Sequence, residues 1–177
     1  IDDLRVFTAR RGDVDAYIAS EYREKIARYF EYIFDEAVQA APGSSIPSVK
    51  LHELEEGRPV GIVGESFTPL LVPHGPTNVY GFRVGKLGYI TDGKRLPPTT
   101  LEALKGVDVL VLNALWFGRP HPSHFNIEEA IEAAREVGAE RTYLTHLTHR
   151  VTHAELEERL PDGVMAAHDG LIVEVPS

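Results

Sequence analysis

Four polar side chains of the metal-binding type follow apolar segments of this chain. His74 ends the run FTPLLVPH, Asp92 follows LGYIT, His146 follows TYLT, and His124 lies in the loop after VDVLVLN. If these runs are strands of one α/β sheet, their carboxyl ends meet at the edge where such sheets build their sites. Imidazole and carboxylate groups together suit Zn, Mn or Fe. The pattern therefore predicts that these residues share a metal site at that edge.

Each of these residues also has an ordinary structural interpretation. His74 before Gly-Pro fits a simple turn, and Asp92 in TDGK fits a turn aspartate, because Asp-Gly is a strong turn signal. His121 lies in a proline-rich loop, and we expect it to stand outside the site. The recurrence of metal-type residues at four strand ends favours a shared site over four separate turns. The chain contains no cysteine, so disulfides and thiolate ligands are excluded.

The segments that must position these residues are short strands alternating, late in the chain, with helices. The expected strands are Asp15–Ala19, Val49–Leu54, Phe67–Val72, Val79–Val84, Leu87–Thr91, Val107–Leu112, Thr142–Thr145 and Leu171–Val175. The expected helices are Glu21–Tyr29, Thr99–Leu104, Ile127–Val137 and Thr152–Arg159. Gly85 is expected to turn a hairpin. This order favours a layered α/β or α+β sandwich.

Length and charge narrow the class of protein further. The 177 residues are expected to form a single domain, and no apolar run approaches the roughly 18 residues that span a bilayer. No signal segment opens the chain, so cytoplasmic placement is the default expectation. The net charge of −9 argues against a broad nucleic-acid surface, although a bound metal would still attract a small phosphate ester. Scarce Met and Cys with abundant Glu and Arg are typical of a thermophile.

Five segments together resemble a known family. PHGP, YGFRVGKLGYITDGK, RPHPSHFNIEEAIEAA, TYLTHLTH and HDGLIVEV occur in the order found in the metallo-β-lactamase-fold superfamily. The nearest branch is the phosphodiesterases acting on phosphoribosyl 1,2-cyclic phosphate, which are relatives of the ribonucleases that process tRNA 3′ ends. The resemblance runs from Ile1 to Val175. It implies an αββα sandwich with two divalent ions, Zn or Mn, at one edge of the paired sheets.

The resemblance also implies roles for the four strand-end residues. His74 would bind the first ion, Asp92 would bridge both, and His146 would bind the second. His124 matches a histidine that contacts the phosphate and assists the leaving group. The family's His-x-His-x-Asp-His motif, expected just before a segment like IDDLR, does not occur in this sequence. We therefore expect a fold incomplete at its N-terminus, holding at most one ion weakly.

The implied function is a metal-dependent hydrolase acting on a small cyclic or nucleotide-like phosphodiester through a metal-bound hydroxide. In that reaction Asp92 and His124 would be the catalytic residues. Two alternatives stay open: a non-catalytic fragment or binding module, and an RNA 3′-end-processing nuclease of the same fold. The acidic balance disfavours the nuclease. A homodimer is a further expectation for either the hydrolase or the binding module.

Overall fold

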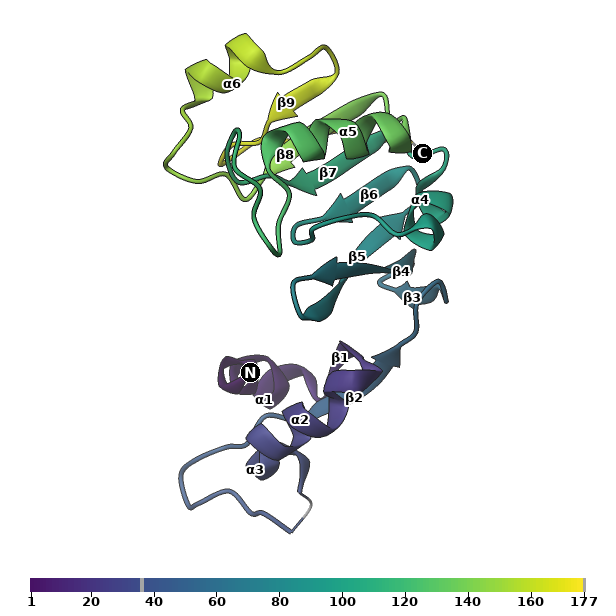
Figure 1. Ribbon diagram of the computed structural model, residues 1–177. Helices are drawn as coiled ribbons and strands as arrows, with labels where there is room; N and C mark the ends of the chain where they lie inside the picture. The colour runs from purple at the N-terminus through teal and green to yellow at the C-terminus, as the bar shows by residue number, and fades with distance from the viewer. Residues whose placement is uncertain (36, 177) are drawn as a thin grey trace. The chain divides into compact units, whose positions relative to one another are not determined.

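Two compact units, Ile1–Glu55 and Glu56–Ser177, make up the chain in this computed structural model. The structure describes residues 1–35 and 37–176, with the side chain of Arg11 also outside the description (Figure 1). The expectation of a single domain over residues 1–177 stays a prediction.

The first unit is a small parallel sheet with short helices. Its elements are η1 (Asp2–Leu4), α1 (Arg5–Arg11), β1 (Val14–Ala19), η2 (Ser20–Tyr22), α2 (Arg23–Tyr29), α3 (Glu31–Phe34) and β2 (Val49–Leu54). Val14 lies opposite Val49, and the two strands run parallel. Parallel neighbours need a long crossover, which α2 and α3 supply here. The expected strands Asp15–Ala19 and Val49–Leu54 are confirmed.

A seven-stranded sheet organises the second unit. Its strands are β3 (Val60–Ile62), β4 (Glu65–His74), β5 (Thr77–Val84), β6 (Leu87–Ile90), β7 (Val109–Asn113), β8 (Arg141–Thr145) and β9 (Val164–Ala166), and they lie in that order across the sheet. Neighbours are antiparallel from β3 to β6 and parallel from β6 to β9. Gly85 turns the expected hairpin between β5 and β6 at φ +53°, a backbone region that favours glycine.

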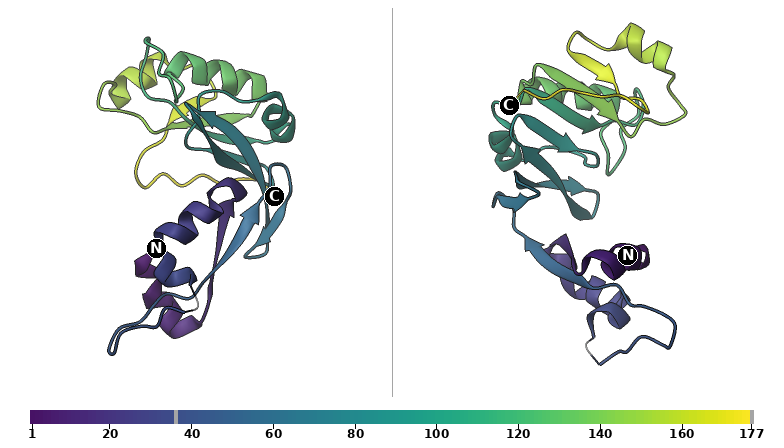
Figure 2. Two further views of the ribbon diagram at one scale, coloured as in Figure 1. Left: turned by 60° about the horizontal axis from the view of Figure 1, so that its bottom comes forward. Right: turned by 180° about the vertical axis from the view of Figure 1, so that it is seen from behind.

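Three helices pack on this sheet: α4 (Pro98–Leu104), α5 (Ile127–Val137) and α6 (His153–Arg159). α4 contacts β4 and α5, α5 contacts β7, and α6 contacts β9 (Figure 2). The core between sheet and helices includes Leu70, Val72, Ile90, Leu112 and Leu144 from the strands and Ile127, Ala130 and Ala134 from α5. α5 begins with a capping box at Asn126 and ends at Gly138 in the left-handed conformation.

Strand direction decides where the candidate site lies. β4 runs antiparallel to β5, and β5 runs antiparallel to β6, so β4 points the same way as β6, β7 and β8. The carboxyl ends of these four strands therefore meet at one edge of the sheet (Figure 1). That edge is the one that the sequence pattern predicts.

The expected strand Leu171–Val175 is wrong. The position beside β8 is taken instead by β9, with Thr142 opposite Val164. A turn then redirects the chain, with the Leu171 N–H donating to the His168 carbonyl, and Ile172 is left 89% exposed. The alternating pattern of that segment indicated strand propensity, but the sheet edge was already occupied.

Among the described residues, no helix is both long enough and apolar enough to cross a bilayer.

Candidate metal centre

His74 is the last residue of β4, and the backbone fixes its ring. Gly75 follows at φ +62°, and a Cβ there would lie 3.2 Å from the Cβ of Ser123, so the turn and the loop before α5 are in close contact. The Nδ1 atom of His74 lies 3.0 Å from the Ser123 carbonyl oxygen. A carbonyl oxygen only accepts, so Nδ1 carries the proton and Nε2 keeps its lone pair. Metal-binding histidines are commonly held in this way.

Asp92 follows β6 and is held by the glycine behind it. A Cβ on Gly93 would collide with the side chain of Val72, and its φ of +154° also favours glycine. The Gly93 carbonyl accepts from the Asn113 side-chain amide at 3.1 Å and from the Phe125 N–H at 3.0 Å. The Asp-Gly pair therefore serves more than a surface turn, because three neighbouring segments converge on it.

The ion pair between Lys94 and Glu129 also stabilises the segment around Asp92. Lys94 Nζ lies 2.6 Å from both carboxylate oxygens of Glu129, and the side chains are 26% and 31% exposed. Glu129 also accepts the backbone N–H of Asn126 as part of the capping box of α5. Lys94 N–H donates to the Pro73 carbonyl at 2.8 Å. These contacts connect backbone that lies within two residues of Asp92, His74 and His124.

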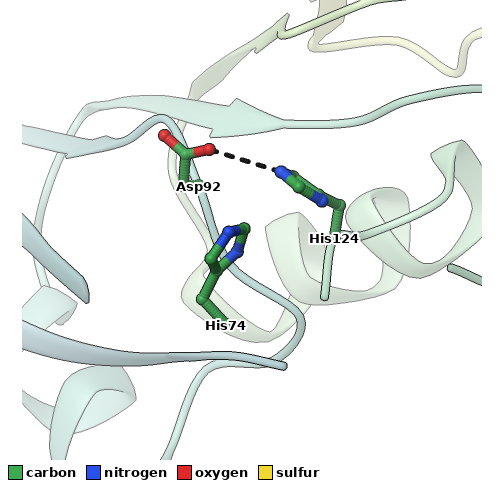
Figure 3. Close-up of side chains that lie close together, drawn as sticks. All are labelled: His74, Asp92 and His124. Atoms are coloured by element: carbon green, nitrogen blue, oxygen red, sulfur yellow. Dashed lines mark hydrogen bonds and ion pairs between the residues drawn. The ribbon is translucent and has the colours of Figure 1, made fainter. Parts of the chain in front are cut away.

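His124 lies between the other two imidazoles. Its ring meets those of His74 and His146 edge-on, with centroids 4.5 and 4.7 Å away. Its Nε2 atom lies 3.3 Å from Asp92 Oδ1 (Figure 3). Burial lowers the pKa of His124 below its ordinary value, with a further lowering by His74 and His146, and the bond to Asp92 opposes this only in part. His124 is therefore a neutral imidazole at neutral pH.

His146 follows β8 in an uncommon backbone conformation. Its φ is +61°, in the left-handed region that few residues other than glycine adopt, although histidine tolerates it better than most. In this conformation its Nε2 atom lies 3.3 Å from the same Asp92 Oδ1 atom that faces His124. Residues held in such conformations cluster at functional sites. The strained backbone brings the imidazole back over the sheet edge.

These side chains fit a divalent cation. One ligand atom each from His74, Asp92 and His124 lies within 4.8 Å of the others (Figure 3). His146 Nε2 faces the same carboxylate at 3.3 Å. Two imidazoles facing one carboxylate oxygen make a donor set typical of zinc sites. The structure therefore brings together all four residues predicted from the sequence. Their division into ligands and substrate contacts stays a prediction, and the compact group contains His124 in place of His146.

Ser123 and His121 are the neighbours that sequence reasoning missed. Ser123 Oγ lies 3.0 Å from His124 Nδ1, and His121 Nδ1 lies 3.3 Å from the same atom. His121 was expected to stand outside the site, whereas its ring contacts that of His124. The tight spacing of HPSHFN is the only sequence signal that points to this contact.

A cavity of 540 Å³ opens beside His146. Its lining residues are Thr145, His146, Leu147, His153, Ala167, His168 and Asp169. Its volume lies in the range of small-molecule sites. The sheet edge therefore offers both a metal-type cluster and space for a ligand next to it.

Comparison with known proteins shows the family to which this fold belongs. The family described as β-lactamase superfamily domain matches residues 1–147. A diphosphatase from the PhnP family superposes with a TM-score of 0.80 at 32% identity, over 98% of this chain and 66% of that chain. Zn²⁺-bound PqqB from Methylobacterium extorquens superposes with a TM-score of 0.63 at 18% identity, over 96% of this chain and 68% of that chain, which shows the fold alone.

A curated relative matches as well. The octanoyltransferase of Porphyromonas gingivalis is 30% identical over 172 residues, which is 97% of this chain and 34% of that protein. The chain thus spans about a third of that relative's length and just under two thirds of the PhnP-family diphosphatase.

Proposed function

The chain belongs to the β-lactamase superfamily of metal-dependent hydrolases, and on that premise we propose that it hydrolyses a small cyclic or nucleotide-like phosphodiester. The observation that carries the proposal is the convergence of His74, Asp92, His124 and His146 at one sheet edge. The likeness to a diphosphatase of the PhnP family supports phosphoester chemistry. The predicted αββα class is confirmed by these comparisons. The expectation that the fold is incomplete at its N-terminus stays a prediction.

The residues that would hold a divalent ion, Zn or Mn, are His74, Asp92 and one or both of His124 and His146. Such an ion lowers the pKa of bound water and neutralises charge on a phosphoryl oxygen. The protein contributes fixed donor positions. His74 presents Nε2 because its other nitrogen donates to a carbonyl, and Asp92 offers one oxygen to two imidazoles. We propose that these residues hold one ion weakly and that a two-ion site would need ligands beyond them.

His124 is the residue proposed to contact the scissile phosphate. Its side chain is 14% exposed, against 47% for His146, the other imidazole that faces Asp92 Oδ1. Burial keeps it neutral at neutral pH, so it offers a hydrogen-bonding nitrogen rather than a fixed charge. The cavity beside His146 is the proposed place for the rest of the substrate.

Replacing Asp92 tests the proposal directly. We expect Asp92→Ala to lose bound zinc, measured by mass spectrometry of metals, and to lose hydrolysis of bis(p-nitrophenyl) phosphate. Asp162→Ala is the matched control, because Asp162 is exposed and lies outside the cluster. Full zinc content and full hydrolysis in Asp92→Ala would refute the proposal. Zinc binding without any hydrolysis in the unaltered protein would favour the non-catalytic binding module.

The octanoyl transfer named for the P. gingivalis relative is not carried over. The alignment covers 34% of that protein, and the site described above is a histidine–carboxylate cluster rather than an acyl-binding groove.

A further inference from the structure

Asn113 is a polar residue in the most deeply buried part of the second unit. It ends β7, the strand VLVLN, at the carboxyl edge of the sheet where the candidate metal centre lies. Its side chain is completely buried, and every other residue of that strand is apolar. A buried amide is unfavourable unless its donor and its acceptor both form hydrogen bonds. The contacts of the two ends of this amide therefore indicate why an asparagine stands here.

The two ends of the Asn113 amide differ. Nδ2 donates to the Gly93 carbonyl at 3.1 Å, and this contact fixes the orientation of the amide, because a carbonyl oxygen only accepts. Oδ1 is buried, and no donor among the described residues reaches it. A buried acceptor without a donor lowers stability, whereas an apolar side chain of similar shape has no such group. The bond to Gly93 is thus what asparagine offers here and leucine does not.

The Gly93 carbonyl connects two residues of the candidate metal centre. Gly93 directly follows Asp92 in the chain. Its carbonyl also accepts the N–H of Phe125 at 3.0 Å, and Phe125 directly follows His124. With two donors on one oxygen, the backbone that carries Asp92 is bound both to the end of β7 and to the backbone that carries His124.

The end of β7 is bound to the His146 segment as well. Asn113 lies opposite Thr145 in the sheet, and the Ala114 N–H donates to the Thr145 carbonyl at 2.8 Å. Thr145 directly precedes His146. Asn113 therefore lies where the backbones behind the carboxylate and two of the imidazoles meet.

We propose that Asn113 is a positioning residue, which holds the Asp92 carboxylate in place against its neighbouring imidazoles through the Gly93 carbonyl and lowers the stability of the fold in doing so. Asp92 is sensitive to its backbone position, because one of its oxygens faces both His124 and His146 at 3.3 Å. Groups that orient metal ligands from behind contribute to metal affinity. The inference rests on the proposed function only for the divalent ion that the cluster would bind.

Asn113→Leu tests both parts of this inference, because it keeps the approximate shape and removes both ends of the amide. We expect zinc affinity, measured by competition with a chromophoric chelator, to fall about tenfold, the lower end of such effects, since Asn113 acts through one backbone link. We expect the urea midpoint of the metal-free protein to stay the same or rise, because the acceptor without a donor is removed too. Asn113→Val repeats the measurement with a smaller, β-branched side chain that suits a strand.

Thr100→Val is the matched control. Thr100 is 1% exposed, and its hydroxyl donates to the Leu71 carbonyl at 2.8 Å, inside β4 rather than at its carboxyl end. Like Asn113→Leu, this change removes a buried side-chain donor from a backbone carbonyl. We expect the opposite result from it, a lower urea midpoint with unchanged zinc affinity.

The outcomes separate positioning from a purely structural role. Unchanged zinc affinity in both Asn113 variants overturns the positioning role. A urea midpoint for Asn113→Leu as low as that of Thr100→Val overturns the loss of stability assigned to Asn113, and indicates that a bound water satisfies Oδ1 in solution.

The inference and the proposed function fail separately. Weaker zinc binding by Asn113→Leu, with no hydrolysis of bis(p-nitrophenyl) phosphate by the unaltered protein, would support this inference and overturn the proposed function. Hydrolysis by the unaltered protein, with equal zinc affinity in Asn113→Leu, would do the reverse.

Discussion

The ion pair between Lys94 and Glu129 is predicted to stabilise the second unit and the candidate metal centre together. Lys94→Met keeps the aliphatic stem and removes the charge, and Glu129→Gln keeps an acceptor for the Asn126 N–H. A double-mutant cycle on these two changes isolates the energy of the pair from the other contacts that each side chain makes.

The expected magnitude follows from geometry and exposure. Lys94 Nζ is 2.6 Å from both oxygens, which is a close, charge-assisted contact. The side chains are 26% and 31% exposed, so solvent screens part of the attraction. Charge-assisted bonds contribute about 1.5–3 kcal/mol and exposed ion pairs about 0.2–1 kcal/mol. We therefore expect a coupling energy of about 1–1.5 kcal/mol.

Urea unfolding of the metal-free protein measures this coupling. Trp116 is the only tryptophan, and it lies beside His121, so its fluorescence follows the unit that carries the site. The matched control is the pair Lys105–Glu102, whose side chains are both 71% exposed and whose coupling should stay below about 0.5 kcal/mol. A coupling energy for Lys94–Glu129 no larger than that of the control would refute the reasoning.

Three further changes test other parts of the fold. Val63→Asn should raise the unfolding free energy by about 1 kcal/mol, because Val63 is β-branched, 98% exposed and at φ +52°. Thermal unfolding of this variant, compared with that of the control variant Val63→Ala, checks the prediction. Gly88→Ala should lower it by about 1–3 kcal/mol, since the new Cβ would lie 2.7 Å from Leu104, and an unchanged urea midpoint would contradict this. The bond from the Thr152 backbone lowers the pKa of Glu155, so its contribution to stability is present above the unfolded pKa of about 4.3 and lost as pH falls through the folded value. The stability difference between the unaltered protein and Glu155→Gln should therefore shrink below about pH 4, as measured by urea unfolding across pH; a constant difference would argue against the assignment.

The sheet edge was predictable because its signals are local. The apolar runs before His74, Asp92 and His146 form strands in the structure, as the sequence predicts. The glycines that follow His74 and Asp92 form turns there. The hairpin at Gly85 follows from its short two-residue turn. Strand direction in such a sheet then places these residues together without further information.

Features that depend on competition between distant segments were not predictable. The position beside β8 went to Val164–Ala166 rather than to the more strand-like residues near Ile172. The short strand β3 precedes a turn at Val63, where a β-branched residue gives no turn signal. The role of Ser123 depends on a backbone carbonyl, which no residue type reveals.

The strand directions also place the candidate metal centre at one end of the sheet in the second unit and several turns at the opposite end. The turns at Gly85, Gly106 and Gly138 precede β6, β7 and β8, and they lie about one strand length from the histidines, which is about 13–17 Å for strands of four or five residues. A Cβ at any of these three glycines would meet nothing within 4 Å. An insertion next to these glycines would leave the candidate metal centre open, whereas replacing one of them would strain the backbone, because all three have a positive φ.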